Sequence, residues 1–221
     1  MPQLKALIGA CAAAFLLGGG LASGPASAQE DQIPPGDGAP EALPALPLPP
    51  GGEAGEDEAA PEAAVEALLD ELAAPELTEA EAERVERRIG AIWSRSGSAS
   101  MDLLLRRGRE ALESGDPQAA LEHLTALTDH APSFAEGWNA RATAFYALGR
   151  PGEALEDVAR ALSLEPRHFM ALAGLGVLME EMGYPEDALR AYLAARALHP
   201  HLAQVNDAVE RLELDTRGQA L

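Results

Sequence analysis

An interval of 34 residues recurs through the second half of this 221-residue chain. Five positions keep this spacing three times each. They are Gly115, Gly149 and Gly183; Pro117, Pro151 and Pro185; Ala120, Ala154 and Ala188; Leu121, Leu155 and Leu189; and Pro132, Pro166 and Pro200. So many positions in phase predict one small structural unit that is repeated in tandem.

Each unit has the pattern helix, turn, helix. Its glycine stands where a first helix ends, and glycine adopts the left-handed conformation found at such ends at little cost. A proline follows two residues later, which suits the first turn of the next helix because the N–H of that position needs no partner. In the first unit Asp116 is a natural N-cap between Gly115 and Pro117.

This pattern, over Met101 to Leu202, resembles the tetratricopeptide repeat family. The positions that the family fills with large, small and aromatic residues recur here. They are Leu104, Trp138 and Leu172 (large); Gly108, Ala142 and Gly176 (small); Ala111, Phe145 and Met179 (aromatic in the family); Ala120, Ala154 and Ala188 (small); Leu124, Val158 and Tyr192 (large); and Leu127, Ala161 and Ala195 (small). Ala111 and Leu127 depart from the pattern, which indicates a looser first unit.

The resemblance implies an all-α fold, a right-handed α-solenoid of three helix pairs at residues 101–134, 135–168 and 169–202. It also implies that Trp138 and Phe145 are core residues between stacked helices.

Apolar stripes predict further helices on both sides of the repeats. The stripes are Val65, Leu68, Leu69 and Leu72; then Val85, Ile89, Ile92 and Trp93; and finally Val205, Ala208, Val209 and Leu212. The first two, separated by Pro75 and a capping-box pattern from Thr78 to Glu81, predict an antiparallel helical hairpin at 62–95. The third predicts a helix at 203–214. A stack of helix pairs leaves an apolar face at each end, and we expect these two elements to cover those faces.

Residues 1–28 have the pattern of a signal peptide. Lys5 precedes an apolar stretch from Ala6 to Leu21, and Ala26-Ser27-Ala28 has the small residues of a cleavage site. The apolar stretch is shorter than the roughly 20 residues that span a bilayer. We therefore expect export, cleavage after Ala28, a periplasmic location and no stable membrane insertion afterwards. The alternative is lipidation of Cys11, the only cysteine, which cleavage would otherwise remove.

Residues 29–61 predict a disordered acidic linker. This segment is rich in proline and acids and has no basic residue, so it cannot bury enough apolar surface to offset the entropy of ordering. The whole chain carries a formal net charge of −20. Such a charge repels phosphate backbones and favours a monomer, so we expect no nucleic-acid partner.

Side chains that carry chemistry are few. Five histidines remain after the leader, at His123, His130, His168, His199 and His201, and we expect the turn histidines to be solvated and not to bind metal. Glu180 and Glu181 are adjacent and so point about 100° apart on a helix, which is weak support for a catalytic pair. No nucleophile arrangement is present. We expect no cofactor and no catalysis.

In the resembled family, the first helix of each pair lines a groove through positions two, five, nine and twelve. Here these are Asp102, Leu105, Arg109 and Leu112; Glu136, Asn139, Thr143 and Tyr146; and Met170, Ala173, Val177 and Glu180. The peptide-contact candidates among them are Leu105, Arg109, Leu112, Asn139, Thr143, Tyr146, Met170 and Val177. The basic carboxylate clamp of chaperone-binding relatives is not reproduced, because Leu105, Arg109 and Thr143 stand at its usual positions.

These observations favour a non-catalytic scaffold that holds a peptide or helix of a partner protein in its groove. The alternatives are a subunit or accessory domain of a cell-envelope enzyme, with Glu180, Glu181 or the turn histidines involved, and a self-associating spacer.

Overall fold

A computed structural model describes residues 61–218, which form nine α-helices and no strand. They are α2 (Pro61–Leu72), α3 (Glu79–Trp93), α4 (Ala99–Glu113), α5 (Pro117–His130), α6 (Ala135–Ala147), α7 (Pro151–Leu164), α8 (Phe169–Glu181), α9 (Pro185–Leu198) and α10 (Ala203–Gly218). The expected signal peptide and almost all of the expected linker lie outside the described residues. None of the nine helices is long and apolar enough to span a membrane.

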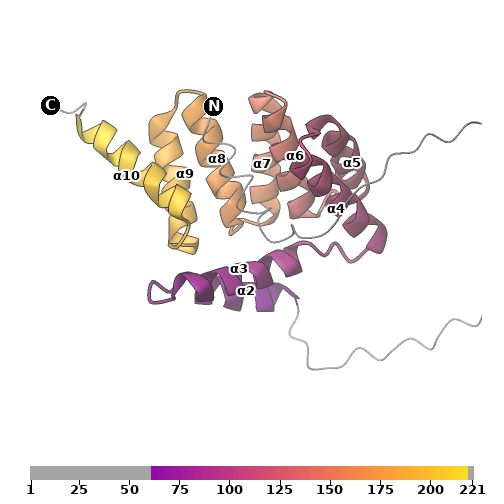
Figure 1. Cartoon of the computed structure of the whole chain (residues 1–221), viewed down its shortest axis with the longest axis horizontal. Coiled ribbons are helices and arrows are strands. Elements are labelled where there is room, and N and C mark those ends of the chain that lie inside the picture. The colour runs from indigo at the N-terminus through magenta and orange to yellow at the C-terminus, as the bar shows by residue number, and fades with distance from the viewer. Residues whose placement is uncertain (1–60, 219–221) are drawn as a thin grey trace, which may run out of the picture.

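Helices α4 to α9 form three stacked antiparallel pairs, α4/α5, α6/α7 and α8/α9 (Figure 1). The turn within each pair uses the repeated glycine: Gly115, Gly149 and Gly183 have φ values of 79°, 71° and 84°. The repeated proline two residues later begins each second helix. The predicted all-α stack of repeated helix pairs is therefore confirmed.

Close contact inside a pair explains the repeated small residues. A Cβ atom added to Gly176 would lie 2.5 Å from the ring of Tyr192, and one added to Gly108 would lie 2.5 Å from Cγ of Leu124. The two helices of a pair approach so closely at these points that only hydrogen fits on the first helix.

The expectation that Trp138 is a core residue was wrong. Trp138 is half-buried, and its indole Nε1 donates a hydrogen bond to the carbonyl oxygen of Pro132 at 3.0 Å. The guanidinium of Arg141 lies 4.7 Å from the centre of the indole ring, and that of Arg160 lies 6.0 Å from it. The ring therefore packs against cations at the surface. Phe145 does pack against the buried residues of its own pair.

The C-terminal helix covers the last pair, as expected. The stripe on α10 is buried, and Val209 is fully inaccessible. It packs with Ala188, Tyr192 and Ala195 of α9 in one apolar cluster.

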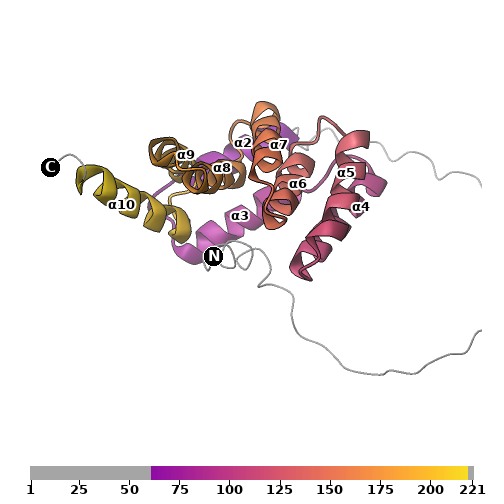
Figure 2. The ribbon, with the colours of Figure 1, turned by 90° about the horizontal axis from the view of Figure 1, so that it is seen from above.

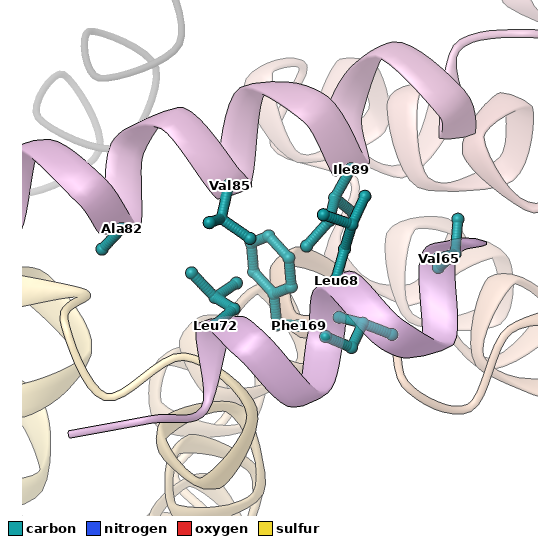
Figure 3. Close-up of a cluster of buried hydrophobic side chains, with 8 residues drawn as sticks. Val65, Leu68, Leu72, Ala82, Val85, Ile89 and Phe169 are labelled. Atoms are coloured by element: carbon teal, nitrogen blue, oxygen red, sulfur yellow. The ribbon is translucent and has the colours of Figure 1, made fainter. Parts of the chain in front are cut away.

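The N-terminal hairpin does not cover the first pair, which corrects the expectation. Helices α2 and α3 lie beneath the array, across the ends of the repeat helices, in both views (Figures 1 and 2). Their apolar faces enclose the ring of Phe169, the first residue of α8 (Figure 3). Leu198 and Leu202 pack against the same cluster.

Two features fit this placement. Arg106, Arg107 and Glu110 of α4 are exposed, so α4 presents polar side chains to solvent where no hairpin covers it. Gly97, with a φ of 81°, lies in the short loop between α3 and α4, where the chain turns back beneath the array.

Candidate functional site

Glu136, on the first turn of α6, is the centre of a buried polar cluster at one end of the groove positions. Its side chain is only 9% exposed. One carboxylate oxygen accepts a hydrogen bond from Nη2 of Arg109 at 2.6 Å, and the other contacts Nε2 of His168 at 2.7 Å. Nδ2 of Asn139 lies 3.3 Å from the same carboxylate. The first helices of all three pairs thus meet at one anion, since His168 is the N-cap of α8.

The hydrogen bonds determine the tautomer of neutral His168. The backbone N–H of Ala171 donates to Nδ1 at 3.2 Å, so Nδ1 carries no proton. Nε2 then carries the proton and donates it to the carboxylate of Glu136. Burial alone raises the pKa of Glu136, but the hydrogen bonds from His168 and Arg109 and the positive charge of Arg109 lower it to about 2. Glu136 is therefore an ionised, fully paired structural group at neutral pH.

Helix α3 contributes its last residues to this cluster. The Oγ atom of Ser94 accepts a hydrogen bond from Nη1 of Arg109 at 2.8 Å and donates one to the carbonyl oxygen of Gly90. The indole of Trp93 stacks on the ring of His168, with ring centres 4.2 Å apart and planes 14° apart. The hairpin thus occupies the end of the groove that Glu136 lines.

The candidate peptide contacts fall into three groups. Leu105 is 1% exposed and lies in the core of the first pair, so its expected role as a contact needs correction. Arg109 and Asn139 bind Glu136, and Met170 packs against the hairpin cluster. The remaining four are half-buried and lie outside the hairpin cluster and the Glu136 cluster. We call them the open groove positions: Leu112, Thr143, Tyr146 and Val177.

Acidic side chains border the open groove positions. The hydroxyl of Tyr146 donates a hydrogen bond to Glu181, while Glu180 accepts one from Arg211 at 2.9 Å. Burial and the two nearby carboxylates raise the pKa of the Tyr146 hydroxyl, so this tyrosine remains neutral and donates. Glu180 and Glu181 thus have different hydrogen-bond partners, Arg211 and Tyr146.

Two of the turn histidines differ from expectation, whereas His130 is exposed, as expected. His168 and His199 are 1% and 2% exposed, so these turn histidines are buried and not solvated. His199 contacts Glu86 of α3 at 3.4 Å, and His201 contacts the carbonyl oxygen of Ala74 at 3.1 Å. Across residues 61–218 no group of three or more histidine, cysteine or acidic side chains is placed to hold a metal ion.

The sequence offered little sign of this cluster. Glu136 was named only as a groove position, and Trp93 only as part of an apolar stripe. Trp93 and Glu136 both contact His168 because the hairpin folds back against the array. No local sequence pattern predicts this arrangement. The one available signal was the recurrence of histidine at the turns after the second and third pairs, at His168 and His199.

Comparisons with known proteins match this fold. Residues 105–163 and 139–203 match the family described as tetratricopeptide repeat. A TPR repeat-containing protein of Rhizobium etli is 33% identical over 124 residues, which are 54% of this chain and 61% of that protein. The small glutamine-rich tetratricopeptide repeat-containing protein 2 of Saccharomyces cerevisiae is 30% identical over 112 residues, 51% of this chain and 32% of that protein. The chain thus spans less than two thirds of either relative.

Solved structures share the architecture. The first TPR domain of Spaghetti (RPAP3), bound to an HSP90 peptide, superposes with a TM-score of 0.52 at 19% identity, covering 54% of this chain and 95% of that domain. The crystal structure of MamA superposes with a TM-score of 0.50 at 19% identity, covering 62% of this chain and 78% of that one. At such identities the likeness concerns the fold alone. Together with the family match, it shows that residues 105–203 are similar to tetratricopeptide repeats and share their fold of stacked helix pairs.

Proposed function

We propose that this protein is a non-catalytic scaffold that binds a segment of a partner protein at its open groove positions. The observation that carries the proposal is that Leu112, Thr143, Tyr146 and Val177 lie along the first helices of all three pairs, half-buried and not covered by the hairpin cluster. Such a mixed apolar and hydrogen-bonding surface on rigid helices suits an extended peptide or a helix.

The partner segment should be neutral or basic. Glu180 and Glu181 lie beside Tyr146, and their charges contribute to the raised pKa of its hydroxyl, so the local field favours cations. An acidic peptide would meet repulsion there, and Arg109 is already bound to Glu136. This chemistry differs from recognition of an acidic peptide by a basic clamp.

The test is site-directed photocrosslinking in intact cells. A photoreactive residue in place of Tyr146 should yield a discrete crosslinked band, and one in place of Ala159, which is exposed on α7, should not. Co-expressed wild-type protein should compete for the partner and weaken the band, whereas co-expressed Thr143→Glu with Tyr146→Ala, with unchanged helicity, should not. Equal crosslinking from both sites, or equal competition by the wild type and the double variant, would exclude the open groove positions.

We further propose that the protein acts in the periplasm. Support comes from the basic start, the apolar stretch and the small residues before Gln29. Mass spectrometry of protein from fractionated Gram-negative cells should find a periplasmic chain that begins at Gln29. A chain that retains Met1 in the cytosol would contradict export, and a lipidated fragment that begins at Cys11 would replace free release with a lipid anchor.

A further inference from the structure

The repeat array completes its own cores without the hairpin. The apolar clusters of the repeats and α10 consist of residues from Met101 onward. The hairpin forms a further cluster, in which Phe169 is the only buried residue of the array, and the half-buried Leu202 alone packs against both this cluster and that of α10. Elements whose cores are separate can open without unfolding one another. The hairpin can therefore detach while the repeat array stays folded.

The contact between hairpin and array leaves polar atoms unpaired. Within the part of the chain that the structure describes, only two buried side-chain polar atoms have no hydrogen-bond partner: Nε1 of Trp93 and Nδ1 of His199. Trp93 packs against Phe169, and Phe169 against His199, with ring centres 5.4 Å and 5.1 Å apart. Both unpaired atoms thus lie in this one contact. A buried unpaired polar group costs roughly 1–3 kcal/mol, and exposure to water removes this cost.

The remaining contacts are complementary in charge. Arg167, in the turn before α8, binds Glu66 and Asp70 of α2, the latter at 2.7 Å. These two carboxylates are four residues apart and therefore lie on the same side of the helix. His199 faces Glu86 of α3. The array thus presents basic groups and Phe169 to a helix that carries acids beside an aliphatic stripe.

Among the described residues, polar contact at the tip of the hairpin is limited to His201, whose Nε2 lies 3.1 Å from the carbonyl oxygen of Ala74. A shallow depression separates the turn after α2 from α9, and it is lined by Ala73, Pro75, Leu193, Arg196, Ala197 and Pro200. The other end is tied to the array by Arg109 through Ser94, next to the loop that contains Gly97. The hairpin can therefore swing about this loop while the tie at Ser94 persists.

We propose that the α2–α3 hairpin is a releasable cover, and that the surface beneath it, formed by Arg167, His168, Phe169, Leu198 and His199, binds an acidic amphipathic helix of a partner protein. The hairpin itself shows the chemistry of that partner: large aliphatic residues at helical spacing and two carboxylates one turn apart facing Arg167. This surface is separate from the open groove positions, so it goes beyond the scaffold function proposed above.

The test uses a full-length variant that opens the cover and leaves the array unchanged. Glu66→Arg with Asp70→Arg reverses both exposed partners of Arg167 and leaves the apolar face of α2 intact. Glu62→Arg with Glu76→Arg is the matched control, since both carboxylates are exposed and belong to none of these contacts. Hydrogen exchange should lose protection over residues 61–93 in the first variant only, with residues 101–212 still protected.

A peptide-binding measurement then tests whether a helix can occupy the uncovered surface. A fluorescently labelled synthetic peptide of residues 61–95 should bind the opened variant at least tenfold more tightly than the wild type or the control. The factor arises because binding to a covered surface is weakened by the fraction of molecules in the open state. Replacing Glu66 and Asp70 of the peptide with Gln should weaken its binding to the opened variant.

Three outcomes would overturn the proposal. Loss of exchange protection in hairpin and repeats together would show one cooperative unit. Equal peptide binding to all three proteins, or none to any, would show that the covered surface is not a helix site. A dimer whose hairpins exchange between copies, detected by light scattering, would make a second copy the occupant in place of a partner helix.

Discussion

Arg141 of α6 and Asp157 of α7 form a two-pronged ion pair, with Nε to Oδ2 at 2.7 Å and Nη2 to Oδ1 at 2.8 Å. The third nitrogen, Nη1, donates to Oγ1 of Thr128 on α5 at 2.7 Å. The side chains of Arg141 and Asp157 are 14% and 5% exposed. One guanidinium thus connects three successive helices in the middle of the array.

Arg141→Met should destabilise the protein by about 3–5 kcal/mol, because it leaves the carboxylate of Asp157 buried and without its cation. The double variant Arg141→Met with Asp157→Leu should recover much of this loss, since no uncompensated charge remains. Arg150→Gln is the control: its pair with Glu153 is 45% and 44% exposed, and the change should cost less than about 1 kcal/mol. Urea denaturation followed by circular dichroism measures all three. Equal losses of stability for Arg141→Met and Arg150→Gln would show that the buried pair contributes no more to stability than the exposed pair.

Two glycines of α8 offer a second comparison. Gly176→Ala should destabilise the array, because the new Cβ would lie 2.5 Å from the rigid ring of Tyr192. Overpacking of this kind costs about 1–3 kcal/mol, which exceeds the gain in helix propensity of up to about 1 kcal/mol. Gly174→Ala has open space within 4 Å and should stabilise by that smaller amount. If this packing is correct, thermal unfolding gives a lower melting temperature for Gly176→Ala and a higher one for Gly174→Ala than for the wild type.

The covering role of α10 predicts a third contrast within one helix. Val209 is fully buried, whereas Leu214 is 66% exposed. Val209→Asp places a charge in an apolar cluster and should lower stability by more than about 3 kcal/mol or cause aggregation. Leu214→Asp should change stability by no more than about 0.5 kcal/mol. Light scattering and thermal unfolding check both, and a tolerated Val209→Asp would remove α10 from the core.

Much of the fold was predictable because its causes are local. Gly149 and Pro151 fix the turn within a pair through backbone conformation alone, and the same residues recur at the same interval in the other pairs. The stripe of α10 was predictable for a similar reason, since Val205 and Val209 are one helical turn apart. Such signals need no knowledge of distant contacts.

The position of the hairpin and the polar cluster around Glu136 could not be predicted from such local signals. The hairpin encloses Phe169, about 100 residues from Val65 and Leu68, and no spacing in the sequence connects them. Trp138 was misassigned because the repeat pattern indicates a large residue but not whether cations such as Arg141 and Arg160 will cover it. His168 was misassigned because its partner Glu136 comes from the preceding pair.

The cluster at Glu136 predicts a specific pH dependence. Its pKa is about 2 in the folded protein, below the ordinary value of 4.5, so the unfolded chain binds a proton more readily. The stabilisation from this group is therefore complete above pH 4.5 and is lost as the pH falls towards 2, to a total on the order of 3 kcal/mol.

Glu136→Gln removes the titrating group and tests this expectation. The variant should be less stable than the wild type at pH 5, because Arg109 loses its counter-charge. The difference in unfolding free energy should shrink by about 2 kcal/mol between pH 5 and pH 3, since only the wild type pays for protonation of the cluster. Glu110→Gln, at an exposed position of α4, should show no such change. Urea denaturation at the two pH values provides the comparison, and parallel stability curves for wild type and Glu136→Gln would mean that Glu136 keeps an ordinary pKa in the folded protein.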